Sequence, residues 1–389
     1  MTDWKKYRLC DFIDFNPTIS LKKGTVARKI TMDRLIPHSR DIYDWVYEPY
    51  SGGAKFQNGD TIMARITPCL ENGKHAYVSL LDDGETAYGS TEYIVLRGIP
   101  GISDNRFVYY LSHFPDFKNA AIKSMVGSSG RQRAQVDVLK NLEFYLPGLE
   151  EQSQIADTLS ALDDKIAINN RINHNLEEQA QALFKSWFVD FEPFKDWAFV
   201  DSELGMIPNG WHIKSLLDMT ELFDNKRRPL SGKERSKMDK NYPYYGATSV
   251  MDYVSDYLFD GIYLLMGEDG SVMTEEGFPF LQYVEGKFWP NNHAHVMKGA
   301  NGFSTEFLHC ALLRKVIKPS VTGAVQAKLS QTNMRKILFP CPPTSVINEF
   351  DRIIQGLYGY RRNLEEQNRN LVQARDTLLP KLMSGEIAV

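Results

Sequence analysis

The stretch of sequence that decides the fold is LPGLEEQSQIADTLSALDDKIAINNRINHNLEEQAQALFKSWFVDFEPF, residues 146–194. Residues 150–188 contain no proline and no glycine, the two residues that most strongly disfavour a helix. Apolar side chains recur there at alternating spacings of three and four, which is the heptad pattern of a helix that packs lengthwise on another helix. The pattern predicts one helix of about 37 residues, roughly 55 Å long at ~1.5 Å per residue. A globular lobe needs no helix of that length, so we interpret the stretch as a rod.

The heptad pattern returns 195 positions later, where Asn368 matches Asn173. The same offset aligns KNLEFYLP (140–147) with RKILFPCP (335–342), and both segments predict a short strand, a proline and then the long helix. Since 195 is about half the chain length, we interpret the chain as a tandem duplication. The predicted helix–helix seam and partner interface consists of Leu159, Leu162, Ile166, Asn169, Asn173, Leu176, Leu183, Ile354, Leu357, Leu364, Asn368, Leu371 and Leu378.

A globular lobe that mixes short β-rich runs with brief helical patterns precedes each long helix. The lobe starts match at an offset of 207, where WKKYRLCDF (4–12) resembles WHIKSLLDM (211–219). We expect an α+β fold with two lobes in tandem, each followed by a long α-helix, and the two helices packed antiparallel as a coiled-coil spacer with pseudo-twofold symmetry. The predicted boundaries are 1–148 for the first lobe, 149–190 for the central helix, 191–210 for a linker, 211–342 for the second lobe and 343–384 for the C-terminal helix.

Three asparagines, Asn169, Asn173 and Asn368, interrupt the apolar seam. Polar seam residues lower the stability of a coiled coil but select its register and its partner. A solvent-exposed position for the same asparagines is the alternative that the sequence leaves open.

Composition restricts the class of protein. No apolar run approaches the roughly 18–20 residues of a membrane span, and the start, MTDWKKYRLCDF, lacks the apolar core of a signal peptide. The four cysteines form no C-x-x-C pair and predict reduced thiols of a cytosolic protein. The net charge is −4, and the acidic excess lies in residues 150–200. A polyanion would therefore be held by local clusters rather than by a global field.

Catalytic motifs are missing from the sequence. It contains no G-x-x-x-x-G-K-[ST] loop, no G-x-G-x-x-G after a strand, no H-E-x-x-H and no paired Cys/His spacing. His293 and His295 alternate on a strand pattern and face one side, where satisfied polar or core histidines are more common than metal ligands. The missing motifs favour a binding protein over an enzyme, with no metal bound by this chain.

In each lobe, one polar, glycine-containing loop precedes the last short strand. These loops are MVGSSGRQRAQVD (125–137) in the first lobe and SVTGAVQAKLSQ (320–331) in the second. Glycine lets the backbone approach a ligand closely, and hydroxyl, amide and guanidinium groups donate to phosphates and base edges. Because the loops occupy the same place in both halves, we interpret them as DNA contacts, with a solvated turn as the alternative. The predicted contacts are Ser128, Ser129, Arg131, Gln132 and Arg133 in the first loop and Thr322, Gln326 and Lys328 in the second.

Two further clusters are candidate DNA contacts. The segment DNKRRPLSGKERSK (224–237) lies just before the aromatic stretch YPYYGAT (242–248), and cations beside aromatic rings suit a nucleic-acid surface. The glycine- and proline-bounded loop ARITPCLENGK (64–74) carries two more cations. Solubilising loop chemistry is the alternative for the segment 224–237. The candidate residues are Lys226, Arg227, Arg228, Tyr244, Tyr245, Arg65 and Lys74.

Over nearly its whole length the chain resembles the specificity subunits of type I restriction–modification systems. The resemblance rests on the lobe–helix–lobe–helix plan, on the stretch 146–194, and on YGSTEYIVLR (88–97), LLMGEDGSV (264–272) and KFWPNNHAHVMK (287–298). The second helix departs from the pattern, because it opens PPTSVINEF where the first opens Leu149-Glu150-Glu151-Gln152. This departure puts the start of the second helix, and its contact with a partner, in doubt.

The resemblance implies that each lobe is a target-recognition domain for one half of a split, asymmetric site in double-stranded DNA, and that the helices set the unread gap. It implies a non-catalytic subunit that works with two methyltransferase subunits, which use S-adenosylmethionine. Through them it works with motor-nuclease restriction subunits that use ATP and Mg²⁺. A cytoplasmic protein of a bacterium or archaeon is expected, with no membrane partner. The alternatives are a coiled-coil adaptor that binds only protein and a self-contained DNA methyltransferase.

Overall fold

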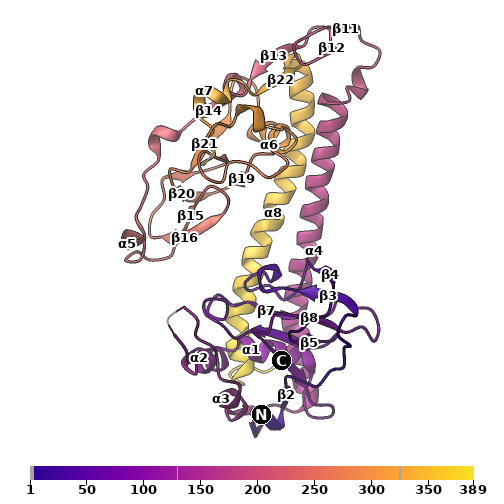
Figure 1. Ribbon diagram of the computed structural model, residues 1–389, viewed down its shortest axis with the longest axis vertical. Helices are drawn as coiled ribbons and strands as arrows, with labels where there is room; N and C mark the ends of the chain where they lie inside the picture. The colour runs from indigo at the N-terminus through magenta and orange to yellow at the C-terminus, as the bar shows by residue number, and fades with distance from the viewer. Residues whose placement is uncertain (1–3, 129, 324–325) are drawn as a thin grey trace. The chain divides into compact units, whose positions relative to one another are not determined.

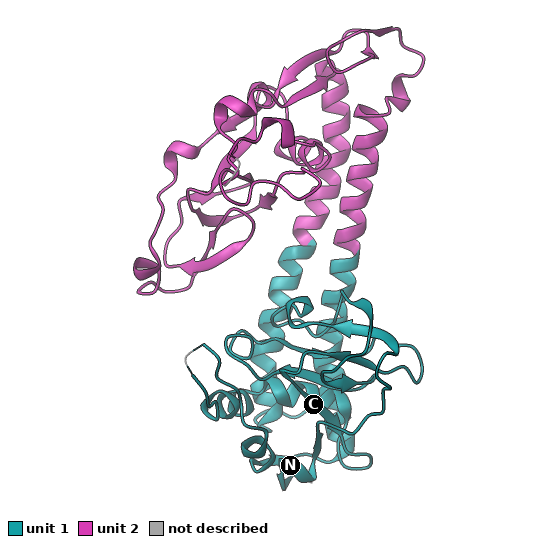
Figure 2. Cartoon of the chain, viewed as in Figure 1, with its two compact units in different colours: residues 1–171, 364–389 teal, residues 172–363 magenta. Residues whose placement is uncertain are grey.

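The computed structural model describes residues 4–128, 130–323 and 326–389 (Figure 1). The chain divides into two compact units, each made of one lobe and parts of two long helices (Figure 2). The first unit contains residues 1–171 and 364–389, and the second contains residues 172–363. No helix among the described residues has the length and apolar character needed to cross a membrane.

The two long helices are α4 (Leu149–Phe188) and α8 (Thr344–Met383), each 40 residues long. Both ends of α8 lie 195 positions after the corresponding ends of α4. The predicted rod and its repeat offset are therefore confirmed.

The described residues of the first unit form three small sheets. A two-stranded sheet pairs β1 (Lys5–Arg8) with β10 (Glu143–Leu146). The first four-stranded sheet has the order β2 (Ile13–Phe15), β9 (Tyr93–Gly98), β6 (Thr61–Ala64) and β7 (His75–Tyr77). The second has the order β4 (Val46–Pro49), β3 (Val26–Ile30), β8 (Ala87–Gly89) and β5 (Lys55–Phe56). The short helices of this lobe are α1 (Asn105–His113), α2 (Pro115–Lys123) and α3 (Val136–Lys140).

The second unit repeats these sheets in the same order. Its two-stranded sheet pairs β13 (His212–Ser215) with β22 (Leu338–Cys341). Its four-stranded sheets have the orders β14 (Thr220–Leu222), β21 (Ala294–Gly299), β18 (Tyr263–Gly267), β19 (Leu281–Val284), and β16 (Val250–Val254), β15 (Tyr242–Tyr245), β20 (Lys287–Pro290), β17 (Phe259–Asp260). The helices α5 (Gly232–Arg235), α6 (Thr305–Leu313) and α7 (Gln331–Met334) complete the lobe.

The two lobes share their topology in detail. In each, the second four-stranded sheet contains one parallel pair, β3·β8 in the first lobe and β15·β20 in the second. The strand β13, which opens the second lobe, begins 207 positions after β1, which opens the first. This is the predicted offset between the lobe starts. The strand order and this offset confirm the tandem duplication and the α+β fold of both lobes.

Each lobe buries apolar surface against both long helices of its own unit. The core of the first unit includes Leu159 from α4 and Leu379 from α8. The core of the second unit includes Phe184 and Phe188 from α4 and Phe350 from α8. In each unit, residues early in one helix contact residues late in the other, so the helix segments run antiparallel. The lobes and helices therefore fold as joint units rather than as separate lobes and spacers.

The asparagines of the first unit lie in the helix seam. Asn169 is fully buried, and its amide donates to the side-chain oxygen of Asn368 at 2.9 Å, while the Asn368 amide donates to Asn170 at 2.7 Å. These paired amides favour a role in register over simple solvation. All residues predicted for the seam are buried or half-buried.

A buried ion pair reinforces this seam. Arg375 of α8 donates to the carboxylate of Asp163 on α4 at 2.7 Å, and the hydroxyl of Tyr110 on α1 donates to the same carboxylate at 2.7 Å. The carboxylate thus joins both long helices to the first lobe.

The two long helices begin differently, as their sequences do. Buried Gln152 of α4 accepts from the backbone of Asp104 and donates to two carbonyl oxygens, whereas buried Ile347 stands at the matching position of α8. The segment before the second lobe contains a short hairpin of β11 (Phe199–Val200) and β12 (Ile207–Pro208).

Candidate nucleic-acid interface

A loop meets the ends of two central strands at the same place in each lobe, which we call the junction. The junction loop comprises residues 126–134 in the first lobe and 322–329 in the second, with residues 129 and 324–325 outside the described structure. The Ala134 amide donates to the Arg65 carbonyl at 2.8 Å, and the Leu329 amide donates to the Glu268 carbonyl at 2.8 Å. These equivalent bonds confirm that the two loops occupy the same place in the duplication.

The ends of the central strands give the residue-by-residue equivalence. The Arg65 amide, just after β6, donates to the Glu92 carbonyl at 2.9 Å, just before β9. In the second lobe the Glu268 amide donates to the His293 carbonyl at 2.8 Å. Arg65 therefore corresponds to Glu268, and Glu92 corresponds to His293. The backbone is shared, but the side chains carry different charges.

An arginine–glutamate pair holds the first junction. The Arg133 guanidinium donates to both carboxylate oxygens of Glu92, at 2.7 to 2.9 Å, and Arg65 lies 3.9 Å from the same carboxylate. The Arg133 hydrogen bonds lower the pKa of Glu92, against the opposing effect of burial. The three side chains are partly exposed, and the Glu92 carboxylate offsets the charge of only one of the two arginines.

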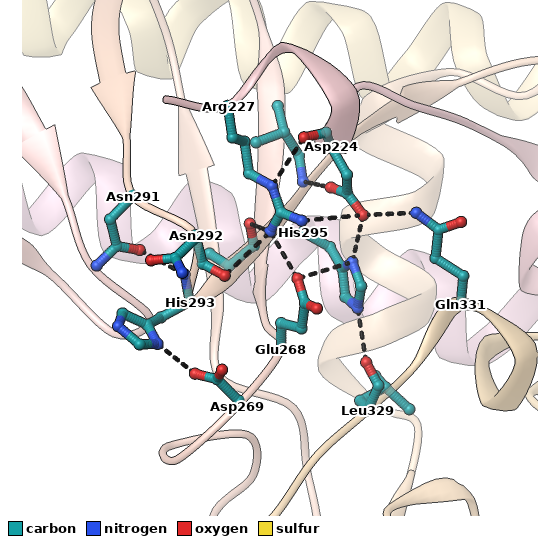
Figure 3. Close-up of polar contacts among 12 residues, drawn as sticks. Asp224, Arg227, Glu268, Asp269, Asn291, Asn292, His293, His295, Leu329 and Gln331 are labelled. Carbon is teal, nitrogen blue, oxygen red and sulfur yellow. Dashed lines mark hydrogen bonds and ion pairs between the residues drawn. The ribbon is translucent and has the colours of Figure 1, made fainter. Parts of the chain in front are cut away.

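A larger network holds the second junction (Figure 3). The Arg227 guanidinium donates to Glu268 at 2.6 Å and to the Ala294 carbonyl at 2.7 Å. Asp224 accepts from His295 at 2.6 Å and from the Gln331 amide at 2.8 Å. These side chains come from segments more than 100 residues apart, and the fold brings them together.

The imidazole of His295 lies between two acceptors. Its Nδ1 faces the Asp224 carboxylate, and its Nε2 lies 2.7 Å from the Leu329 carbonyl oxygen. Burial alone lowers the pKa of His295, but the hydrogen bond and charge of Asp224 outweigh burial, so the pKa is raised overall. Burial likewise acts to raise the pKa of Asp224, and the hydrogen bond from His295 reverses this so that the pKa is lowered.

Asp224, Glu268 and His295 are residue types that also bind metal ions, and their nearest ligand atoms lie within 4.8 Å of one another. Arg227 already places its positive charge against Glu268, and the Asp224 oxygens accept from His295, Gln331 and the Val296 amide. We therefore interpret the group as an ion-pair network. Both histidines are hydrogen-bonded, with exposed His293 paired to Asp269, in agreement with the interpretation of satisfied polar histidines.

Apart from Tyr244, the predicted DNA contacts fall into four groups. The exposed side chains are Ser128, Arg131, Lys226, Arg228, Thr322, Gln326 and Lys328, and the Thr322 hydroxyl donates to the Lys328 carbonyl at 3.3 Å. Half-buried Gln132, Lys74 and Tyr245 lie deeper, and the Lys74 ammonium donates to the Met32 carbonyl at 2.7 Å. Arg65, Arg133 and Arg227 point to carboxylates of their own lobe. Ser129 lies outside the described residues.

Tyr244 differs most from its expected place. Its ring is 1% exposed in the core of the second lobe, and its hydroxyl accepts from the Leu230 amide at 3.0 Å. This tyrosine is therefore not at the surface, because alternate side chains of β15 point inward.

Sequence reasoning missed the carboxylates that organise both junctions, Glu92, Asp224 and Glu268. Their signal was weak but present, since Glu92 and Glu268 directly flank central strands. Arg227 of the cluster 226–228 and the junction loop of the second lobe both contact Glu268. Local sequence patterns do not reveal this contact, because the three segments are far apart in the chain.

A family model described as the type I restriction modification DNA specificity domain matches residues 1–178 and 208–373. The Type I restriction enzyme MjaIX specificity subunit of Methanocaldococcus jannaschii is 28% identical over 303 residues, which are 73% of this chain and 69% of that protein. The Type I restriction enzyme HindI specificity subunit of Haemophilus influenzae is 23% identical over the whole of both chains.

A solved structure, the type I restriction–modification S subunit from M. genitalium, has the same fold. It superposes with a TM-score of 0.51 at 17% identity, and the match covers 98% of this chain and 96% of that one. The family model covers most of both halves of the duplication, and the chain therefore belongs to the type I restriction modification DNA specificity family.

Proposed function

We propose that this chain is the DNA-reading specificity subunit of a type I restriction–modification complex, and that each lobe reads one half of a bipartite, asymmetric site in duplex DNA. The observation that carries the proposal is the duplicated junction. The backbone arrangement is the same in both lobes, but Arg65, Glu92 and Arg133 in the first are replaced by Glu268, His293 and Lys328 in the second. A shared backbone with different side chains in the two lobes is suited to the recognition of two different half-sites.

The candidate contacts in and near the junctions divide by chemistry. Arg131, Lys226, Arg228 and Lys328 suit phosphates, which position a protein on the duplex without reading its sequence. The amides of Gln132 and Gln326 suit adenine N6 and N7, where a good bidentate contact discriminates by about 1–3 kcal/mol. Substituting the cations should therefore weaken binding to all sequences, whereas substituting the amides should change the preferred sequence.

The two long helices act in this proposal as the spacer between the half-sites. One heptad of helix is about 10.5 Å at ~1.5 Å per residue, or about three base pairs at ~3.4 Å per pair. Removing a heptad from both helices together should therefore shorten the unread gap, while removing it from only one should disrupt their pairing.

The chain supplies recognition in this proposal, and chemistry comes from partners. Two methyltransferase subunits dock on the helices and lobes, and they use S-adenosylmethionine to methylate adenines in the half-sites. Restriction subunits that use ATP and Mg²⁺ join through them, in the cytoplasm of a bacterium or archaeon. Membership of the specificity family supports these roles.

The proposal is tested with the complete complex of this chain and its methyltransferase subunits. Methylome sequencing of a host that carries the system identifies the methylated motif, and a duplex with that motif serves as the probe. We expect tighter binding than to random duplex, with affinity falling steeply as salt rises, because phosphate contacts release counterions. A protein-only adaptor would give no salt-dependent binding and no motif, and methyl transfer by this chain alone would establish an enzyme.

A further inference from the structure

The buried imidazole of His295 fixes the junction loop of the second lobe. His295 is 1% exposed on β21, and both of its ring nitrogens face acceptors, the Asp224 carboxylate and the Leu329 carbonyl. A neutral imidazole has only one N–H and can satisfy only one of them. The geometry therefore requires a doubly protonated ring if both hydrogen bonds are to form.

The network reaches the loop from several sides (Figure 3). The Leu329 carbonyl accepts from His295, and the Leu329 amide donates to the Glu268 carbonyl at 2.8 Å. Gln331, two residues further along, donates to Asp224 at 2.8 Å. The backbone next to Lys328, whose side chain is exposed, is thereby held against the ends of β18 and β21.

The first lobe has no such device at the equivalent positions. The Asn16 amide donates to the Val95 carbonyl as the Phe223 amide does to the Val296 carbonyl, so His295 corresponds to Ile94 and Asp224 to Pro17. Neither residue titrates. The first junction loop is held instead by Arg133 and Glu92, a pair in which the guanidinium stays charged throughout the neutral range.

We propose that His295, together with Asp224, is a proton-dependent positioning residue for the DNA contacts of the second lobe, so that reading of one half-site depends on pH between neutral and alkaline conditions while reading of the other does not. The inference rests on the proposed function, because it assumes that the junction loops contact DNA. His295 itself is buried and acts only through the loop.

The charges around His295 support the direction of this effect. The carboxylates of Asp224 and Glu268 and the guanidinium of Arg227 face it, and an imidazolium brings their sum to zero. Against the opposing effect of burial, the hydrogen bond to Asp224 and the charges of the two carboxylates raise the pKa of His295, so the site favours the charged ring. When pH rises through that pKa, the ring keeps one N–H, and the bond to Asp224 or to Leu329 is lost.

The test uses the complete complex and duplexes that carry its methylated motif, with either half scrambled. To assign the halves, residues 1–148 are replaced by the lobe of another family member. The half of the methylated motif that this exchange leaves unchanged is assigned to the second lobe. Discrimination at each half is the ratio of Kd for the scrambled duplex to Kd for the intact duplex, measured from pH 6.5 to 9 at constant ionic strength. Because both ratios come from one complex, pH effects on the partner subunits affect them alike.

We expect discrimination at the second half to fall by about five- to tenfold over this range, the lower end for one good base contact, and discrimination at the first half to stay constant. His295→Gln should lower second-half discrimination and make it independent of pH. His212→Gln, which removes an exposed histidine of the same unit, should leave both profiles unchanged. Thermal unfolding checks that the variants fold. The histidine NMR resonance that His295→Gln removes is that of His295, and it reports the protonation of this ring in the wild-type complex.

Different outcomes separate the two proposals. If the wild-type complex discriminates at both halves but the second-half ratio does not change with pH, or still changes in His295→Gln, the positioning role of His295 is refuted and DNA reading stands. If Glu92→Gln, which breaks the pair that holds the first junction, removes or shifts the pH dependence of discrimination at the second half, the assignment to separate lobes fails. If the complex discriminates at neither half, the proposed function fails first.

Discussion

Removing the buried carboxylate of Asp163 should destabilise the first unit strongly. Asp163→Ala leaves the buried guanidinium of Arg375 without its α4 partner, and it leaves the buried hydroxyl of Tyr110 with only the longer hydrogen bond to Ser160 Oγ at 3.4 Å. Breaking a buried ion pair from one side costs about 3–5 kcal/mol. Arg375 keeps Asp376, which it contacts at 2.8 Å, so we expect a loss of about 3 kcal/mol.

Differential scanning calorimetry of the full chain measures this loss. For a unit of this size, about 3 kcal/mol corresponds to a fall of about 6–12 °C in the Tm of the affected transition. Asp157→Ala is the matched control, since Asp157 makes an exposed pair with Arg106, and exposed pairs contribute about 0–1 kcal/mol. The double change Asp163→Leu with Arg375→Met should recover most of the loss, because it removes both buried charges. A Tm for Asp163→Ala within 2 °C of the control would refute the reasoning.

Three further predictions concern the seam, the second junction and the helix start. Asn169→Leu with Asn368→Leu should raise the Tm of the first unit but loosen helix register, seen as higher stability with impaired assembly with the methyltransferase subunits; no change in either would contradict the seam role. The stability that His295 contributes through its raised pKa should be fully present below pH about 6.5 and should be lost as pH rises through that pKa. The stability that Asp224 contributes through its lowered pKa should be lost as pH falls below about 3.9. Urea unfolding at a series of pH values checks both contributions, and His295→Gln should abolish the loss of stability at alkaline pH. Gln152→Ala should cost about 1–3 kcal/mol by leaving the buried carbonyl of Pro147 and the amide of Asp104 unpaired, measured by urea unfolding with exposed Gln154→Ala as control.

Local periodicity was sufficient to predict the long helices and the duplication. Both helices have a sustained heptad pattern, and the offsets of 195 and 207 appear again at the ends of α4 and α8 and at the starts of β1 and β13. The loops 125–137 and 320–331 were paired by their place before the last strand, which depends only on chain order. These features follow from local sequence, so a reading along the chain could find them.

The side-chain roles at the junctions depend on pairs far apart in the sequence. Arg133 and Arg227 look like free cations in the sequence, but each meets a glutamate 41 positions away. Such pairing depends on which strand ends are neighbours in the sheet, and the divergent lobe interiors gave no signal of that order. Tyr244 was misplaced for a related reason, since the inward face of β15 is decided by the sheet it joins.

If each lobe reads its own half of a split DNA site, exchange of one lobe should change only one half of the methylated motif. Residues 1–148 are replaced by the corresponding lobe of another family member, and the methylome of a host carrying the chimera and its methyltransferase subunits is sequenced. We expect a methylated motif in which one half is new and the other half and the gap are unchanged. A motif in which both halves change, or in which neither changes, would contradict this expectation.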